Sequence, residues 1–150
     1  MDELRDLYQE VILDHNKNPK NYFQMDEPTH SAEGHNPLCG DQVEIFLKVE
    51  NDKIIDISFQ GHGCAISKAA SSVMTSILKG KSIAEAKYLF EKYQHLVTAD
   101  INEAVNVDEY GHLAVFAGVR EFPMRVKCAS LSWHTLLQAL ENKTEMVTTE

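Results

Sequence analysis

The chain has 150 residues, of which 43% are apolar and 25% are charged, and its formal net charge is −9. This length suits one domain with a hydrophobic core and is short for two, so we expect a single domain over residues 1–150 with a polar, frayed tail from about residue 141. The negative charge disfavours nucleic acid as a partner, because phosphate backbones would be repelled. No apolar run approaches the roughly 18 residues of a membrane span, and the acidic start does not resemble a secretory leader. We therefore expect a cytoplasmic protein with no membrane contact.

The first forty residues are predicted to form a helix followed by a loop. Apolar residues recur at helical spacing over residues 3–15, and the pattern ends at Asn18 and Pro19. Residues 20–40 are mostly polar, as is typical of a loop. We nevertheless expect a third strand within residues 20–35, where it would cover an edge of the hairpin that follows.

The next segment alternates between apolar and polar residues, which predicts a β-hairpin. One arm runs from Val43 to Val49 and the other from Ile55 to Phe59, with a turn over residues 51–53. Facing residues of an antiparallel pair lie on the same side of the sheet, so the apolar positions select one register. That register pairs Ile45 with Phe59, Leu47 with Ile57 and Val49 with Ile55.

Further helices are predicted after the hairpin. An apolar stripe marks the first over residues 66–78, and the capping-box residues Ser82 and Glu85 begin a second that runs to about residue 93. Residues 113–119 fit either a short helix or a buried segment, and helical spacing returns over residues 129–140. The pattern predicts an α+β fold, with a small antiparallel sheet of about three strands and helices packed on one face.

The three cysteines stand at the ends of predicted elements and not on the apolar stripes. Cys39 precedes the first strand of the hairpin, Cys64 stands at the start of the helix that follows it, and Cys128 is near the start of the last helix. Extending the hairpin register brings Cys39 to within one residue of facing Cys64, with Asp41 between them. Each cysteine could be a small buried apolar residue in a reducing compartment, but their placement favours a site.

The cysteines and one carboxylate make a ligand set suited to tetrahedral Zn²⁺. The set consists of Cys39, Asp41, Cys64 and Cys128. The spacing is not that of a zinc finger, because no C-x₂-C pair occurs, so the residues alone leave both interpretations open. Three thiolates and a carboxylate would exceed the charge of a divalent ion, and Arg125 is the candidate cation beside them. Lys127 fits a solvated position, and His62 is a possible substitute ligand.

Three stretches of the sequence resemble the signature motifs of the IscU/NifU N-terminal family of iron–sulfur cluster assembly proteins. They read NPLCGD, GHGCAIS and FPMRVKCASLSWHTL, they occur in the family's order, and the similarity covers about residues 5–140. The SufU branch of the family fits best. Scaffold-type members carry a histidine immediately before the third cysteine, where this chain has Lys127, and they shorten the segment between the second and third cysteines.

This resemblance implies a zinc-dependent sulfurtransferase. SufU-like proteins bind Zn²⁺ through residues that match Cys39, Asp41, Cys64 and Cys128, and they accept persulfide sulfur from a PLP-dependent cysteine desulfurase of the SufS type. By the same resemblance, Cys39 receives the sulfur while a desulfurase histidine replaces it on the metal, and Arg125 assists near the site. The further partners implied are downstream iron–sulfur assembly proteins.

Two other functions stay open for this sequence. The same thiolates could hold a [2Fe–2S] cluster on a scaffold protein, although Lys127 in place of a histidine leaves one ligand fewer. The chain could instead be a small interaction domain that zinc stabilises, without chemistry of its own. A colourless zinc protein would favour sulfur transfer, a brown protein with iron and sulfide would favour the scaffold, and an unchanged desulfurase turnover would favour the interaction domain.

Overall fold

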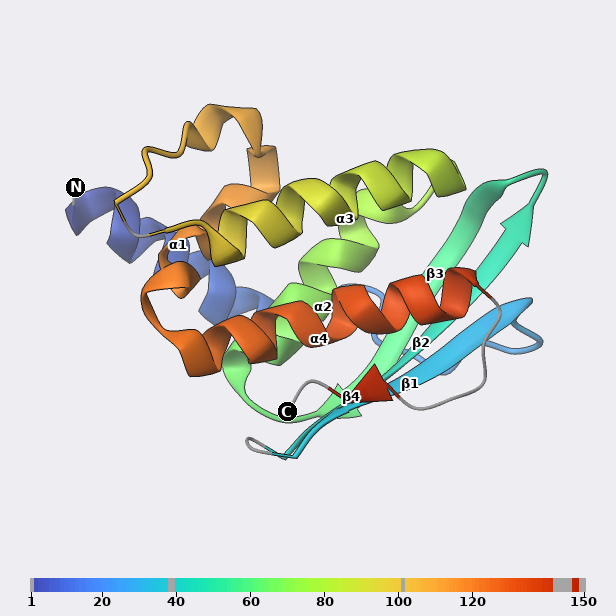
Figure 1. The fold of residues 1–150 in the computed structure, drawn as a ribbon. Helices are drawn as coiled ribbons and strands as arrows, with labels where there is room; N and C mark the ends of the chain where they lie inside the picture. The colour runs from blue at the N-terminus through green and yellow to red at the C-terminus, as the bar shows by residue number, and fades with distance from the viewer. Residues whose placement is uncertain (1, 38–39, 101, 142–146, 149–150) are drawn as a thin grey trace.

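The computed structural model describes residues 2–37, 40–100, 102–141 and 147–148 (Figure 1). In chain order the elements are α1 (Asp2–Lys17), β1 (His30–Asn36), β2 (Asp41–Glu50), β3 (Lys53–His62), α2 (Ala65–Leu78), α3 (Ile83–Thr98), the 3₁₀-helices η1 (Val107–Glu109) and η2 (Gly111–Glu121), α4 (Pro123–Leu140) and β4 (Val147–Thr148). Each predicted helix and both arms of the hairpin are present, and the predicted third strand is β1. Among the helices in the described part of the chain, none combines the length and the apolar character that a membrane crossing needs.

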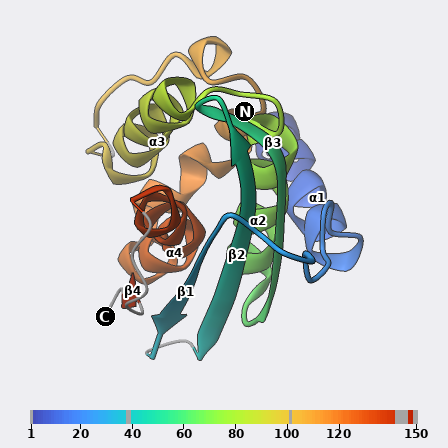
Figure 2. The same cartoon turned by 90° about the vertical axis from the view of Figure 1, so that its right-hand side faces the viewer.

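The strands form one sheet in the order β3-β2-β1-β4. β2 pairs antiparallel with both β1 and β3, and β4 runs parallel to β1. On one face of the sheet, α2 lies against β3 and α4 lies against β1 and β2, while α1 packs on α2 (Figure 1 and Figure 2). This arrangement confirms the predicted α+β class. The two residues of β4, in the tail of the chain, extend the sheet beyond β1.

The hairpin register is confirmed at its centre and wrong at its tip. The predicted pairs found in the structure are Ile45–Phe59 and Leu47–Ile57. The register then shifts by one residue before Val49, which faces Ile54 and not Ile55. This irregularity shortens the turn to Asn51 and Asp52, which both have positive φ, as two-residue hairpin turns of type I′ require. Consequently Ile54 is fully buried and Ile55 is 43% exposed.

The predicted capping box at the start of α3 is confirmed. The side chain of Ser82 accepts the N–H of Glu85, and the Glu85 carboxylate accepts the N–H of Ser82. The helix continues beyond the predicted end to Thr98. Its Tyr93 ring stacks on Trp133 of α4 with 4.9 Å between the ring centroids, and both side chains are fully buried. This stack joins α3 to α4 and so holds α4 in place over the sheet.

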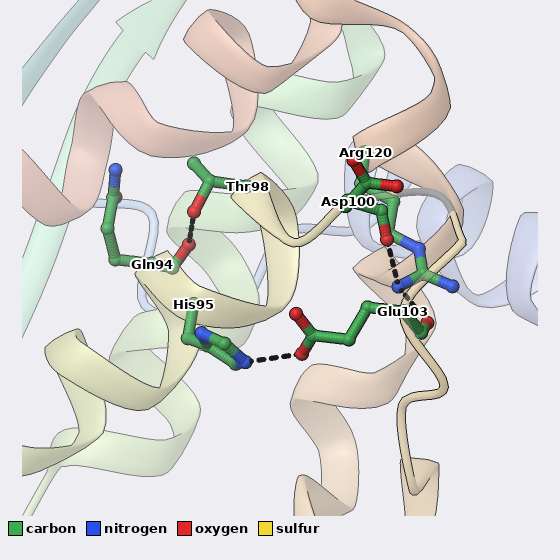
Figure 3. Close-up of polar contacts among 6 residues, drawn as sticks. All are labelled: Gln94, His95, Thr98, Asp100, Glu103 and Arg120. Carbon is green, nitrogen blue, oxygen red and sulfur yellow. Dashed lines mark hydrogen bonds and ion pairs between the residues drawn. The ribbon is translucent and has the colours of Figure 1, made fainter.

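Side chains from α3 and η2 hold the irregular segment between these two helices (Figure 3). The Arg120 guanidinium donates to the backbone carbonyls of Asp100 at 3.1 Å and Glu103 at 2.9 Å. His95 lies 2.8 Å from the carboxylate of Glu103. Residues 113–119, predicted as a short helix or a buried segment, are both, because they belong to η2 and several of its apolar side chains are buried.

Candidate metal centre

Asp41 is the first residue of β2, and it is fully buried. Its Oδ1 atom accepts the backbone N–H of Cys64 at 2.7 Å, and its Oδ2 atom lies 3.8 Å from the Cys64 sulfur. Gly63 leaves room for this carboxylate: a Cβ there would lie 2.1 Å from Oδ1, and its φ of +146° favours glycine. Burying a carboxylate is costly unless it is hydrogen-bonded or paired with a cation, and the position of Asp41 therefore suits a cation ligand.

Cys64 is the N-cap residue of α2, as the sequence predicts. Its sulfur accepts the backbone N–H of Ser67 at 3.5 Å, so the side chain replaces a missing partner of the first helical turn. A hydrogen bond with the Cys128 thiol lowers the pKa of Cys64 to about 7, against burial, which raises it. The thiolate, which is the form that binds metal, is therefore accessible near neutral pH.

Cys128 lies inside the second turn of α4 and is 3% exposed. The expectation that it stands at the start of this helix is wrong, because the helix already begins at Pro123. Proline is favoured at a first helical position, where its missing N–H costs no hydrogen bond. The positive end of the α2 dipole therefore acts on Cys64, whereas Cys128 lies beyond the first turn of α4 and is little affected by the dipole of that helix. Instead, the Cys128 sulfur lies 3.8 Å from the side-chain nitrogen of Asn36.

Three predicted ligands converge from β2, the N-cap of α2 and α4. One ligand atom each from Asp41, Cys64 and Cys128 lies within 4.8 Å of the others, and within the described residues this is the one group found that could hold a metal. A tetrahedral zinc site places sulfur and oxygen ligands about 3.5 Å apart, given Zn–S of about 2.3 Å and Zn–O of about 2.0 Å. The 3.8 Å between the Cys64 sulfur and Oδ2 of Asp41 is close to that spacing, so these side chains fit zinc.

Cys39, the fourth predicted ligand, lies outside the described residues, and its role stays a prediction. β1 ends at Asn36 and β2 begins at Asp41, and these two residues face each other in the sheet register. Position 39 thus belongs to the short connection between two paired strands, two residues from Asp41 in the sequence.

Arg125 and His62 are both exposed. Arg125 lies in the first turn of α4, with its guanidinium 4.7 Å from the centre of the Phe122 ring, and its predicted role beside the centre stays a prediction. The ring of His62 lies 3.0 Å from the side-chain oxygen of Gln42. Among the described residues, His62 is not part of the converging group.

Sequence reasoning missed Asn36, the last residue of β1. Ala32, Gly34 and Asn36 occupy one face of that strand, and all three are buried. A polar residue in the buried phase of a strand needs a hydrogen-bond partner, which is a signal that points to a site. The signal was hidden because the bounds of β1 could not be predicted from a segment with little alternation.

The fold and the centre define a class of small α+β domains that gather thiols and a carboxylate from separate elements at the ends of two strands. The family model described as "NifU-like N terminal domain" matches residues 7–142. The chain therefore belongs to the NifU-like N-terminal domain family, which includes the IscU and SufU proteins of iron–sulfur cluster assembly.

Two curated relatives carry different names. The iron–sulfur cluster assembly scaffold protein IscU of Streptococcus pyogenes serotype M1 is 39% identical over 141 residues, which cover 94% of this chain and 87% of the relative. The zinc-dependent sulfurtransferase SufU of Bacillus subtilis (strain 168) is 35% identical over 131 residues, covering 87% of this chain and 86% of the relative. The identities therefore support the family and leave its two named activities equally close.

Solved structures agree with the fold. FiSufU, a SUF-system protein of Fervidobacterium islandicum AW-1, has a TM-score of 0.79 at 35% identity, covering 87% of this chain and 94% of that protein. The N-terminal part of a NifU-like protein from Brucella abortus also has a TM-score of 0.79, at 23% identity, covering 91% of this chain and 94% of that one. The second likeness shows the fold alone.

Proposed function

We propose that this chain is a zinc-dependent sulfur acceptor. It takes persulfide sulfur from a cysteine desulfurase of the SufS type and passes it toward iron–sulfur cluster assembly. The observation that carries the proposal is the convergence of Asp41, Cys64 and Cys128 to within 4.8 Å. The relationship to a protein named as a zinc-dependent sulfurtransferase supports it.

The zinc ligands would be the thiolates of Cys39, Cys64 and Cys128 and the carboxylate of Asp41. When bound, zinc keeps the thiolates deprotonated at neutral pH and restrains their nucleophilicity. The Asp41 carboxylate is a harder ligand than sulfur and a weaker partner for this ion. A centre with one weaker ligand is better suited to ligand exchange than a purely structural site with four thiolates.

Cys39 is the proposed sulfur acceptor. It belongs to the connection between β1 and β2, whereas Cys64 is the N-cap of α2 and Cys128 lies within α4. In the transfer step the Cys39 thiolate attacks the outer sulfur of the desulfurase persulfide. A new S–S bond forms on Cys39, the S–S bond of the desulfurase breaks, and the desulfurase cysteine leaves as a thiolate. The sulfane sulfur keeps its oxidation level, so the step needs no added oxidant or reductant.

Arg125 would supply positive charge where anionic sulfur arrives. It is exposed, and it stands three residues before Cys128 on an otherwise acidic protein. A local cationic side chain near the centre would favour approach of a persulfide and of an electrostatically complementary partner surface. Lys127, in the position where scaffold-type members carry a histidine, supports the sulfurtransferase branch over the scaffold.

The test combines metal analysis with a desulfurase assay. Alanine and sulfide production from cysteine are measured for a SufS-type desulfurase with and without the zinc-loaded chain. We expect the parent to accelerate turnover and Cys39→Ala to abolish the acceleration while it retains much of its zinc. Asp56→Asn, a surface change on β3, is the matched control and should behave as the parent. Unchanged turnover with the parent, or persulfide trapped on Cys39→Ala, would contradict the proposal.

A scaffold function is the second candidate, and the 39% identity to a protein named IscU favours it. The same thiolates would then hold a [2Fe–2S] cluster as cargo. Anaerobic reconstitution with iron and sulfide separates the two functions. A stable brown protein with stoichiometric iron and sulfide would support the scaffold, whereas a colourless protein that keeps zinc would support sulfur transfer.

A further inference from the structure

Asn36 lies beside the candidate metal centre, where β1 meets α4. Its side chain is fully buried, and Nδ2 donates a hydrogen bond to the Cys128 sulfur at 3.8 Å. A buried amide requires hydrogen-bond partners, and sulfur is a weak acceptor that becomes a stronger one as a thiolate. The contact restrains the Cys128 sulfur from the β1 side of the centre.

The close packing of α4 on β1 holds the two groups together. Gly34 and Asn36 lie two residues apart on the same face of β1, and Cys128, Leu131 and Thr135 recur at helical spacing on α4. A Cβ on Gly34 would lie 2.1 Å from Oγ1 of Thr135 and 3.0 Å from Cδ1 of Leu131. The glycine thus permits a close approach of helix and strand, and Asn36 meets Cys128 two turns before that contact.

We propose that Asn36 is a positioning residue that fixes the Cys128 sulfur through this N–H···S hydrogen bond and keeps Cys128 as a permanent ligand of the centre. The inference rests on the proposed zinc function and extends it to a residue outside the ligand set. The amide withdraws charge from the thiolate without adding a cation. Hydrogen bonds of this kind orient metal ligands and tune their donor strength.

The two helix-borne sulfurs are held by different N–H donors. Cys64 accepts the backbone N–H of Ser67 at 3.5 Å, within its own helix. Cys128 accepts from Asn36, which faces Asp41 across the β1–β2 pair. The ends of two neighbouring strands therefore hold both residues, because Asp41 accepts the backbone N–H of Cys64 and Asn36 donates to the Cys128 sulfur. These hydrogen bonds restrain Cys64 and Cys128. Cys39 is then the ligand best suited to leave the metal and accept sulfur.

Asn36→Leu tests the proposal, since leucine keeps the approximate size of the side chain and removes the donor. Zinc affinity is measured by competition with a chromophoric chelator, and the thiolate charge-transfer band is measured in the Co²⁺-loaded protein. We expect affinity to fall by about 10–100-fold and the band to shift. Thr135→Val, which removes a buried hydroxyl from the same face of α4, should leave both unchanged. Parental affinity and an unmoved band in a folded Asn36→Leu protein would overturn the proposal.

A measurement on metal-free protein keeps the inference separate from the zinc function and from any folding defect of Asn36→Leu. The side-chain amide resonances of Asn36 are recorded by NMR in the parent and in Cys128→Ser. We expect them to shift strongly in Cys128→Ser and little in the control Thr135→Val. Unmoved Asn36 resonances in Cys128→Ser would overturn the inference even if the parent binds zinc. Failure of the parent to bind zinc would instead contradict the proposed function.

Discussion

The backbone N–H of Cys64 donates a 2.7 Å hydrogen bond to the carboxylate of Asp41, which ties the start of α2 to the first residue of β2. The bond uses one oxygen of the carboxylate, and the other faces the Cys64 sulfur at 3.8 Å. Asp41 therefore positions Cys64 through one oxygen and presents its other oxygen to the candidate metal centre. The Asp41 side chain thus both anchors the start of α2 and offers a candidate metal ligand, and substitutions at this position should affect both roles.

Asp41→Ala should lower the zinc affinity of the protein by at least about tenfold, because it removes a proposed ligand and frees the N-terminus of α2 from β2. Chelator competition measures the affinity. Asp56→Asn is the matched control, because the Asp56 carboxylate pairs with Lys79 at 3.4 Å on the surface and is not one of the proposed ligands. The zinc affinity of this variant should equal the parental value. Equal affinities for Asp41→Ala and the parent would remove Asp41 from the ligand set.

Gly63→Ala should destabilise the protein more than Gly80→Ala. Both glycines have φ in the range that L-residues rarely adopt, at +146° and +87°, so each substitution carries a backbone cost of about 1–2 kcal/mol. At position 80 the new Cβ meets nothing within 4 Å, whereas at position 63 it would lie 2.1 Å from Oδ1 and 2.8 Å from Cα of Asp41. We expect a total loss of about 3 kcal/mol or more for Gly63→Ala. Urea denaturation of the metal-free proteins compares the two, and similar losses would contradict the predicted clash.

The stability of the metal-free protein should fall on acidification, with a contribution from His15. This side chain contacts Ser72 of α2 at 2.7 Å. Burial lowers the pKa of His15 below 6.5, with smaller opposing and assisting effects from Asp14, Lys20 and His112. The unfolded chain therefore takes up the proton more readily, so the stabilising contribution is complete above about pH 6.5 and is lost as the pH falls toward the folded-state pKa.

His15→Gln should reduce this loss of stability. Free energies of unfolding are measured with urea at about pH 7.5 and about pH 5.5, on either side of the ordinary histidine pKa. The difference between the two values should be smaller in His15→Gln than in the parent. The control Lys87→Gln, at an exposed position of α3, should keep the parental difference. An unchanged pH dependence in His15→Gln would show that protonation of His15 does not oppose folding. Burial also lowers the pKa of His134, so part of the effect should remain.

Arg120→Ala should loosen the segment that follows α3 without changing the metal centre. The guanidinium donates to the carbonyls of Asp100 and Glu103 (Figure 3), and its removal leaves these groups to water. Hydrogen exchange of the amides in residues 102–106 should accelerate, with a global loss of about 1 kcal/mol. Lys87→Ala, at an exposed position of α3, should leave exchange there unchanged. Parental exchange rates in Arg120→Ala would mean that other contacts hold this segment.

Much of the secondary structure was predictable because its signals are local. Neighbours within a few residues determine the capping box of Ser82 and Glu85 and the N-cap position of Cys64. The alternation of apolar and polar residues in the two arms of the hairpin determines the pairing of Ile45 with Phe59. The tip of the hairpin was not predictable, because Ile54 and Ile55 are both isoleucine and either can point inward. The position of Cys128 within α4 was misplaced for a similar reason: Pro123 permits a helix start five residues earlier, and no apolar stripe marks that first turn.

The sequence by itself determined the helices, the central register of the hairpin, the residue types of the candidate ligands and the family motifs that contain them. Only the tertiary structure decided that Asp41, Cys64 and Cys128 meet, and that Asn36 and not a helix terminus contacts the Cys128 sulfur. The physical reason is distance along the chain. The chain between Cys64 and Cys128 runs through α2, α3 and η2, so the distance between the two sulfurs depends on how α4 packs on β1. The side-chain volumes at positions such as Gly34 and Thr135 determine that packing, and no local sequence pattern encodes it.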